Sequence, residues 1–134
     1  METHVKAIGG LLIALALLHA VFPRYFNWAE DLKPLTLINR QLMYIHTLFI
    51  ALVVLLMGLL CWNCAPALVA TPLGRNVALG LGVFWLARLL TQFFGYSRQL
   101  WQGKPFETTV HVVFILLWAY LTTVFFAVAL GLRF

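Results

Sequence analysis

Residues 42–62 read LMYIHTLFIALVVLLMGLLCW, a stretch without a single Asp, Glu, Lys or Arg. About 20 consecutive apolar residues in a helix are enough to cross the hydrocarbon core of a bilayer. The stretch therefore predicts a membrane-spanning helix, in which His46 and Thr47 are polar exceptions near the start. This helix decides the fold class, because three further segments of the same kind occupy most of the remaining chain.

The four predicted spans leave only short connections between them. They cover about residues 5–22, 36–62, 72–95 and 105–132. The first is expected to stop at Pro23, which cannot continue a helix without losing a hydrogen bond. Thr36 and Thr71 are expected helix caps, with Pro72 at the first helical position after Thr71.

Composition supports the same fold class. The chain has 134 residues, of which 63% are hydrophobic and 10% charged. A soluble domain of this size leaves much of its surface exposed, so it could not hide that much apolar area. We predict an all-α integral membrane protein, with residues 1–134 forming one domain. Because short connections make sequential helices antiparallel, the expected architecture is an up-down four-helix bundle.

Two connections, residues 23–35 and 96–104, are rich in aromatic and polar side chains. Tyr and Trp rings collect at the boundary between lipid and water, so both connections are predicted to be short interfacial segments. In the first, Asn27 followed by Glu30 resembles a helix cap with its reciprocal partner, which predicts a short interfacial helix there.

The distribution of Lys and Arg predicts the orientation in the membrane. The side with the two aromatic connections carries Arg24, Lys33, Arg40, Arg98 and Lys104, and the other side carries Lys6, Arg75 and Arg133. Positive residues are more frequent in cytoplasmic loops. We therefore expect residues 23–35 and 96–104 to be cytoplasmic in a bacterial inner membrane.

The formal charge is +5, from nine Lys and Arg against four Asp and Glu, and the positive residues are scattered and form no basic stripe. A nucleic-acid binder would show a basic patch, so nucleic acid is not an expected partner. The expected partner is the lipid bilayer itself, whose anionic headgroups the positive side chains can meet.

The polar residues inside the spans fall on one side of the predicted membrane. At 1.5 Å of rise per residue along a helix, six of them come to the half next to the aromatic connections. They are His19, His46, Arg88, Gln92, Glu107 and His111. Ionisable groups are costly in hydrocarbon, so their clustering predicts a buried polar site.

Helical spacing orders these groups further. Arg88, Gln92 and Tyr96 recur at i, i+4 and i+8 and form one polar stripe. Arg88 keeps its charge under all conditions and therefore needs a partner. Glu107 is its nearest candidate by register, and Glu107 is also spaced i, i+4 from His111. The alternative is that the anion opposite Arg88 is a ligand, a lipid phosphate or a cofactor carboxylate.

Three chemistries could use this set of residues. Three histidines with an open position, His19, His46 and His111, suit a transition metal. His46 and His111, on the second and fourth spans, could instead be the axial ligands of a b-type haem, with Arg88 or Arg40 at a propionate. Without a metal, the same set could bind a quinone or an anionic lipid. Tyr44, Gln92 and Glu107 would then support the ligand-binding residues.

Our leading hypothesis is a cofactor-binding or quinone- and lipid-binding membrane module in a redox or lipid-related role. One alternative is a non-catalytic accessory subunit of a larger membrane complex, with Gly80 and Gly82 in docking grooves. Another is a small transporter with Arg88 in an anion path, which would need a homo-oligomer. No motif specifies a reaction, so enzyme activity is not predicted. The pair Cys61 and Cys64 lies on the opposite side from the histidines and is not part of the predicted site.

Overall fold

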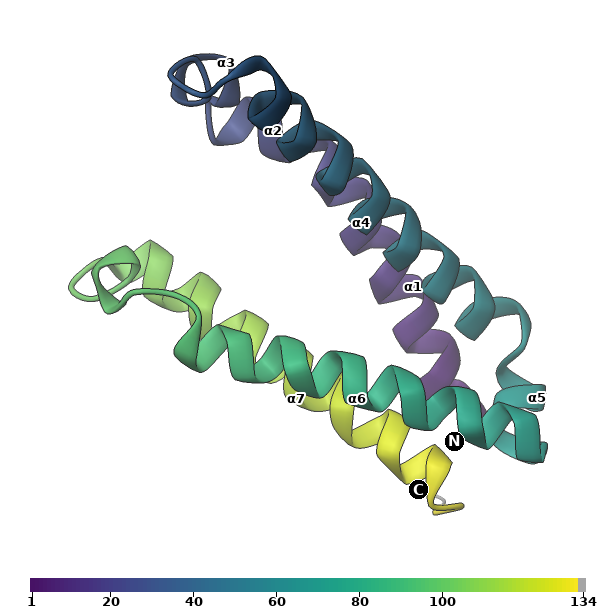
Figure 1. Ribbon diagram of the computed structural model, residues 1–134. Coiled ribbons are helices and arrows are strands. Elements are labelled where there is room, and N and C mark those ends of the chain that lie inside the picture. The colour runs from purple at the N-terminus through teal and green to yellow at the C-terminus, as the bar shows by residue number, and fades with distance from the viewer. Residues whose placement is uncertain (133–134) are drawn as a thin grey trace. The chain divides into compact units, whose positions relative to one another are not determined.

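The computed structural model describes residues 1–132 and is all-helical, with 85% helix and no strand among these residues (Figure 1). Four helical segments are long and apolar enough to cross a membrane, which confirms four long apolar helices at the predicted places. They are Glu2–Tyr25, Leu37–Asn63, Pro72–Phe94 and Pro105–Ala129. Arg133, which entered the predicted charge balance, lies outside the described residues. The chain divides into two compact units, residues 3–65 and residues 66–132 with residues 1–2, which are described separately below.

The first unit begins with a helical path that runs beyond the predicted stop at Pro23. Helix α1 (Glu2–Leu18) continues through the 3-10 turn η1 (His19–Val21) into the short helix α2 (Phe22–Tyr25). Pro23 lies in the first turn of α2. A proline is tolerated there because the amide hydrogen that it lacks would have no intrahelical partner. The prediction that the helix ends at Pro23 was therefore wrong.

The connection that follows contains the single-turn helix α3 (Trp28–Asp31), which confirms a short helix in this segment. The predicted cap is absent, because the Asn27 side chain makes no capping hydrogen bond. Asn27 instead adopts the left-handed conformation, with φ of 54° and ψ of 48°. Asn is one of the few residues other than glycine that visit this region routinely. Glu30 pairs with Lys33 at 2.9 Å on the exposed surface.

Helix α4 (Leu37–Asn63) returns antiparallel to α1 and α2 to complete a helical hairpin (Figure 1). Thr36 precedes it but makes no side-chain capping bond. The two helices approach closely where Gly9 of α1 faces Gly58 and the backbone of Trp62 in α4. Small residues at such a crossing allow two backbones to come together, as is common between membrane helices.

The second unit is a helical hairpin of α6 (Pro72–Phe94) and α7 (Pro105–Ala129), preceded by α5 (Ala65–Ala70) and linked by the 3-10 turn η2 (Arg98–Leu100) (Figure 1). The predicted cap at Thr71 is confirmed, because its hydroxyl oxygen accepts a 2.9 Å hydrogen bond from the amide of Gly74. Pro72 and Pro105 both lie in the first turns of their helices, as predicted for Pro72. The interior of this hairpin includes Trp85 and Phe125, both almost fully buried.

Candidate functional site

The eight predicted site residues fall into two groups, one in each unit. His19, Arg40, Tyr44 and His46 belong to residues 3–65, and Arg88, Gln92, Glu107 and His111 belong to residues 66–132. Each group is described within its own unit.

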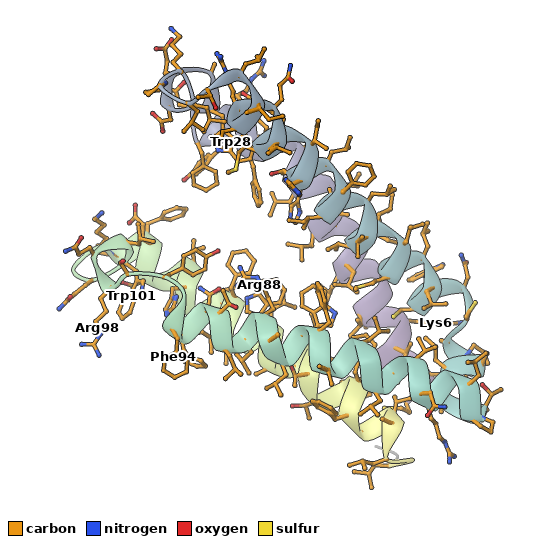
Figure 2. All side chains as sticks on the ribbon, in the orientation of Figure 1. Lys6, Trp28, Arg88, Phe94, Arg98 and Trp101 are labelled. Atoms are coloured by element: carbon orange, nitrogen blue, oxygen red, sulfur yellow. The ribbon has the colours of Figure 1, made fainter. Side chains whose placement is uncertain are left out.

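Arg88 of α6, labelled in Figure 2, is half-buried, and its guanidinium lies over two aromatic rings. Its guanidinium carbon lies 5.1 Å from the ring centroid of Trp118 and 5.6 Å from that of Tyr96. Its Nη2 donates a 3.3 Å hydrogen bond to the Tyr96 hydroxyl. Cation–π contacts of this kind contribute about 0.5–2 kcal/mol each. The Arg88 and Tyr96 ends of the predicted stripe are therefore in contact.

The guanidinium of Arg88 is incompletely satisfied by the described residues. Its Nη1 is buried without a hydrogen-bond partner among them. The ion pair found in residues 1–132 is Glu30 with Lys33, so the expected pairing of Arg88 with Glu107 is not formed. Glu107 is exposed in the first turn of α7. A buried donor without an acceptor costs about 1–3 kcal/mol, and more when it carries charge.

Gln92 joins the two helices of the hairpin through a directed chain of hydrogen bonds. The indole Nε1 of Trp118 donates to Gln92 Oε1 at 3.2 Å, and Gln92 Nε2 lies 2.8 Å from His111 Nδ1. An indole can only donate, which assigns Oε1 of Gln92 as the acceptor and Nε2 as the donor. His111 Nδ1 must therefore accept. A neutral His111 then carries its proton on Nε2, and it presents a donor to any ligand.

A stacking contact with Trp101 also holds His111 in place. Its ring is stacked on Trp101, with the centroids 4.7 Å apart and an interplanar angle of 10°. Trp101 is itself tied to α7, because Thr108 donates a 2.5 Å hydrogen bond to its carbonyl oxygen. The His111 ring is therefore positioned by Gln92 and Trp101, and not by Glu107, which has the i, i+4 spacing to it. The site in this unit is thus built from α6, α7 and the connection between them.

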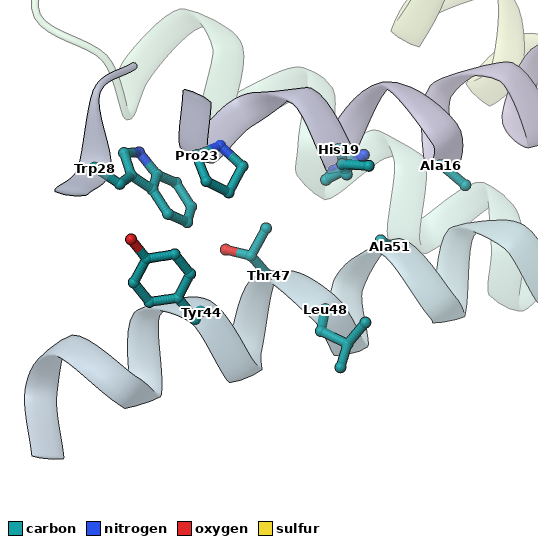
Figure 3. A pocket seen from close by; sticks show the side chains of 9 residues that line it. Ala16, His19, Pro23, Trp28, Tyr44, Thr47, Leu48 and Ala51 are labelled. Atoms are coloured by element: carbon teal, nitrogen blue, oxygen red, sulfur yellow. The ribbon is translucent and has the colours of Figure 1, made fainter. Parts of the chain in front are cut away.

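In the other unit, His19 lines a cavity of about 210 Å³ between the end of the first span and α4 (Figure 3). Pro23 and Trp28 lie on one side of it, and Tyr44 and Thr47 of α4 lie opposite. Trp28 is buried, and its ring meets that of Tyr44 edge-on, with the centroids 5.4 Å apart. The segment 23–35 therefore supplies part of the cavity wall.

The histidines of this unit have the opposite tautomer from His111. His19 Nδ1 lies 2.8 Å from the carbonyl oxygen of Leu15, and His46 Nδ1 lies 2.9 Å from that of Leu42. A carbonyl oxygen can only accept, so Nδ1 carries the proton in both rings. Nε2 of a neutral ring then keeps a lone pair. His46 is exposed on α4 and is not among the residues that line the cavity.

The remaining predicted group of this unit is Arg40, which is half-buried in the first turn of α4. Its Nε is buried and has no hydrogen-bond partner in the described chain. Tyr44, one helical turn further on, is a wall of the cavity. Both residues are thus near the polar start of α4, as the sequence predicts.

The predicted metal and haem chemistry finds little support in these contacts. Among residues 1–132, no group of three or more His, Cys, Asp or Glu side chains is arranged to hold a metal ion. Of the three predicted ligands, His19 and His46 present a lone pair on Nε2, whereas the lone pair of His111 is used by Gln92. Cys61 and Cys64 are both free thiols, the first buried and the second exposed.

Three tryptophans that contact the predicted site residues or line the cavity were not predicted from the sequence. The ring of Trp118 lies under the guanidinium of Arg88, and its Nε1 donates a hydrogen bond to Gln92. Trp101 stacks on His111, and Trp28 lines the cavity. A signal for Trp118 was present, because it lies seven residues after His111 and thus on the same face of α7.

Comparison with known proteins adds no assignment: no family model, curated protein or solved structure matches this chain.

Proposed function

We propose that this protein is an integral membrane module that binds an anionic lipid through Arg88. The observation that carries the proposal is the guanidinium of Arg88, which has a buried Nη1 without an acceptor and no carboxylate opposite it in residues 1–132. A permanent charge in a membrane-spanning segment calls for a counter-charge or water. An anionic headgroup would supply that charge from the bilayer itself.

The neighbouring groups favour an acceptor-rich ligand. Arg88 has donors only, and the chain from Trp118 through Gln92 makes Nε2 of His111 a donor as well. Phosphate oxygens accept hydrogen bonds and pair with guanidinium in a fork geometry. The exposed ring of Tyr96 would lie beside the acyl chains, which have no polar groups to satisfy, whereas the ring of Trp118 is buried in the hairpin.

The four helices would form the predicted up-down bundle in a bacterial inner membrane, with residues 23–35 and 96–104 on the cytoplasmic side. Arg88 is six residues before the end of α6 at Phe94. At 1.5 Å per residue, its Cα would lie roughly 9 Å from that helix end. An arginine side chain can extend its charged end over much of such a distance toward the headgroups.

The proposal can be tested by counting bound lipid on the purified protein. Wild-type protein and Arg88→Gln are reconstituted in nanodiscs that contain phosphatidylglycerol and phosphatidylcholine, then released into detergent for native mass spectrometry. We expect wild type to retain phosphatidylglycerol and Arg88→Gln to bind it about tenfold more weakly, because charged hydrogen bonds are worth about 1.5–3 kcal/mol. Arg88→Lys should be intermediate, since it keeps the charge and loses the fork.

Arg98→Gln is the matched control, because Arg98 is exposed in η2 on the same predicted side of the membrane. Equal loss of lipid in both variants would show general attraction to anionic lipid and would overturn the proposal. Displacement of the lipid by inorganic phosphate would also overturn it, in favour of a site for a free anion. A Soret band, or stoichiometric metal in the same sample, would instead support the haem or metal hypothesis.

A further inference from the structure

The cavity beside His19 has a chemistry different from that of the Arg88 site. Its space arises because small side chains, Ala16 and Ala20 from the first span and Ala51 from α4, face it from both helices. Its walls are otherwise mainly apolar and aromatic. The polar groups among its lining residues are therefore few, and their hydrogen-bonding state decides what the cavity can bind.

Two of these polar groups donate their protons to backbone carbonyl oxygens of their own helices. The proton on His19 Nδ1 goes to the carbonyl oxygen of Leu15 at 2.8 Å, and the Thr47 hydroxyl donates to the carbonyl oxygen of Met43 at 2.9 Å. A neutral His19 therefore has only an acceptor left, at Nε2. Thr47 likewise has only the lone pairs of its hydroxyl oxygen. His19 and Thr47 thus present only acceptors to the cavity.

The size and walls of the cavity suit a single flat ring. Its volume is about 210 Å³. An apolar cavity of roughly 150 Å³ accepts benzene, so there is room here for one substituted ring. The edge-on pair of Trp28 and Tyr44 supplies the kind of aromatic wall against which another ring packs favourably. A haem macrocycle would be far too large.

We infer that this cavity binds the hydroxyl-bearing ring of a hydroquinone, with its O–H groups donating to Nε2 of His19 and the hydroxyl oxygen of Thr47. Such a ring supplies the donors that the cavity lacks and an apolar body that fits its walls. The oxidised quinone has carbonyl oxygens only, which would face other acceptors. The Tyr44 hydroxyl could donate to one oxygen of a quinone. The two acceptors, Nε2 of His19 and the hydroxyl oxygen of Thr47, are satisfied only by the O–H groups of the reduced form, which is therefore favoured over the oxidised one.

The experiment compares both redox forms of one probe. The full-length protein is placed in nanodiscs of phosphatidylcholine, and decyl-substituted benzohydroquinone is titrated without oxygen, with empty nanodiscs as the blank. The same titration is run with the corresponding benzoquinone under oxidising conditions. We expect the hydroquinone to bind about tenfold more tightly, the ratio expected for one satisfied hydrogen bond in an apolar site. Equal affinity for the two forms would overturn the inference.

Two substitutions test the named acceptors. His19→Phe keeps a ring of similar size and removes Nε2, and it should weaken hydroquinone binding about tenfold. Thr47→Val removes the hydroxyl without changing the side-chain shape, and it should weaken binding several-fold even if His19→Phe does not fold. Thr109→Val is the matched control, because the hydroxyl of Thr109 makes the same bond to a carbonyl one turn earlier, at 2.8 Å, on an exposed face.

Unchanged binding in Thr47→Val and in a folded His19→Phe would overturn the inference. Equal weakening in Thr109→Val would do so too, since that residue does not line the cavity. Because the nanodiscs contain no anionic lipid, the result does not depend on whether Arg88 binds a phosphate headgroup. Failure of this inference is thereby separated from failure of the proposed function.

Discussion

The close approach of α1 and α4 makes Gly9→Ala a sharp test of the packing in residues 3–65. A methyl group added at Gly9 would lie 2.7 Å from the backbone nitrogen of Trp62 and 2.8 Å from the carbonyl oxygen of Gly58. Backbone atoms cannot rotate aside as a side chain can, so the helices would have to move apart. At Gly10, the same methyl would meet only the tip of the Trp62 ring, at 3.8 Å.

The expected magnitude follows from two opposing effects. Overpacking a well-fitted contact costs about 1–3 kcal/mol. Replacing a helical glycine by alanine gains up to about 1 kcal/mol through helix propensity. Gly9→Ala should therefore lower the free energy of unfolding by up to about 2 kcal/mol. Gly10→Ala should leave it unchanged or raise it by up to about 1 kcal/mol.

The two variants are compared by unfolding in mixed micelles with a rising fraction of dodecyl sulfate, followed by circular dichroism and tryptophan fluorescence. Gly58→Ala is the reciprocal substitution, because its methyl would lie 2.9 Å from the carbonyl oxygen of Gly9 and from Ile13. It should behave like Gly9→Ala. If Gly9→Ala proves as stable as Gly10→Ala, the helices do not cross where the structure has them, and the reasoning fails.

Substitutions at Asn27, Thr71 and Thr36 probe the local structure of the connections and helix starts. Asn27 has φ of 54°, so Asn27→Ala should lower the free energy of unfolding by about 1 kcal/mol. Asn27→Gly should leave that free energy unchanged or raise it. A larger loss with glycine than with alanine would contradict the left-handed conformation of Asn27. Thr71→Ala should lower the free energy of unfolding by about 1 kcal/mol because it removes a formed helix cap. Thr36→Ala should lower it little, because the Thr36 side chain makes no capping bond. Thermal unfolding of both variants in the same detergent compares them, and equal losses of stability would refute the expected difference.

Much of the site in α6 could be predicted from the chain because it depends on spacing within one helix. Arg88, Gln92 and Tyr96 lie on one stripe by the helical repeat alone, and the structure joins Arg88 to Tyr96. The partner of His111 could not be predicted in this way. Glu107 has the right spacing along α7, but Gln92 reaches His111 from the facing helix. Which side chain contacts His111 depends on the register of α6 against α7. Spacing within one helix does not determine that register.

The sequence by itself determined the four long helices and their approximate ends, because hydrophobic length, capping residues and helix-starting prolines act locally. The cap at Thr71 is an example. Only the tertiary structure decided that Gly9 rather than Gly10 meets the facing helix, and that Trp28 walls the cavity beside His19. These outcomes depend on how one helix is rotated and shifted against another. That choice is made by the packing of many side chains together, and each side chain alone is compatible with several registers.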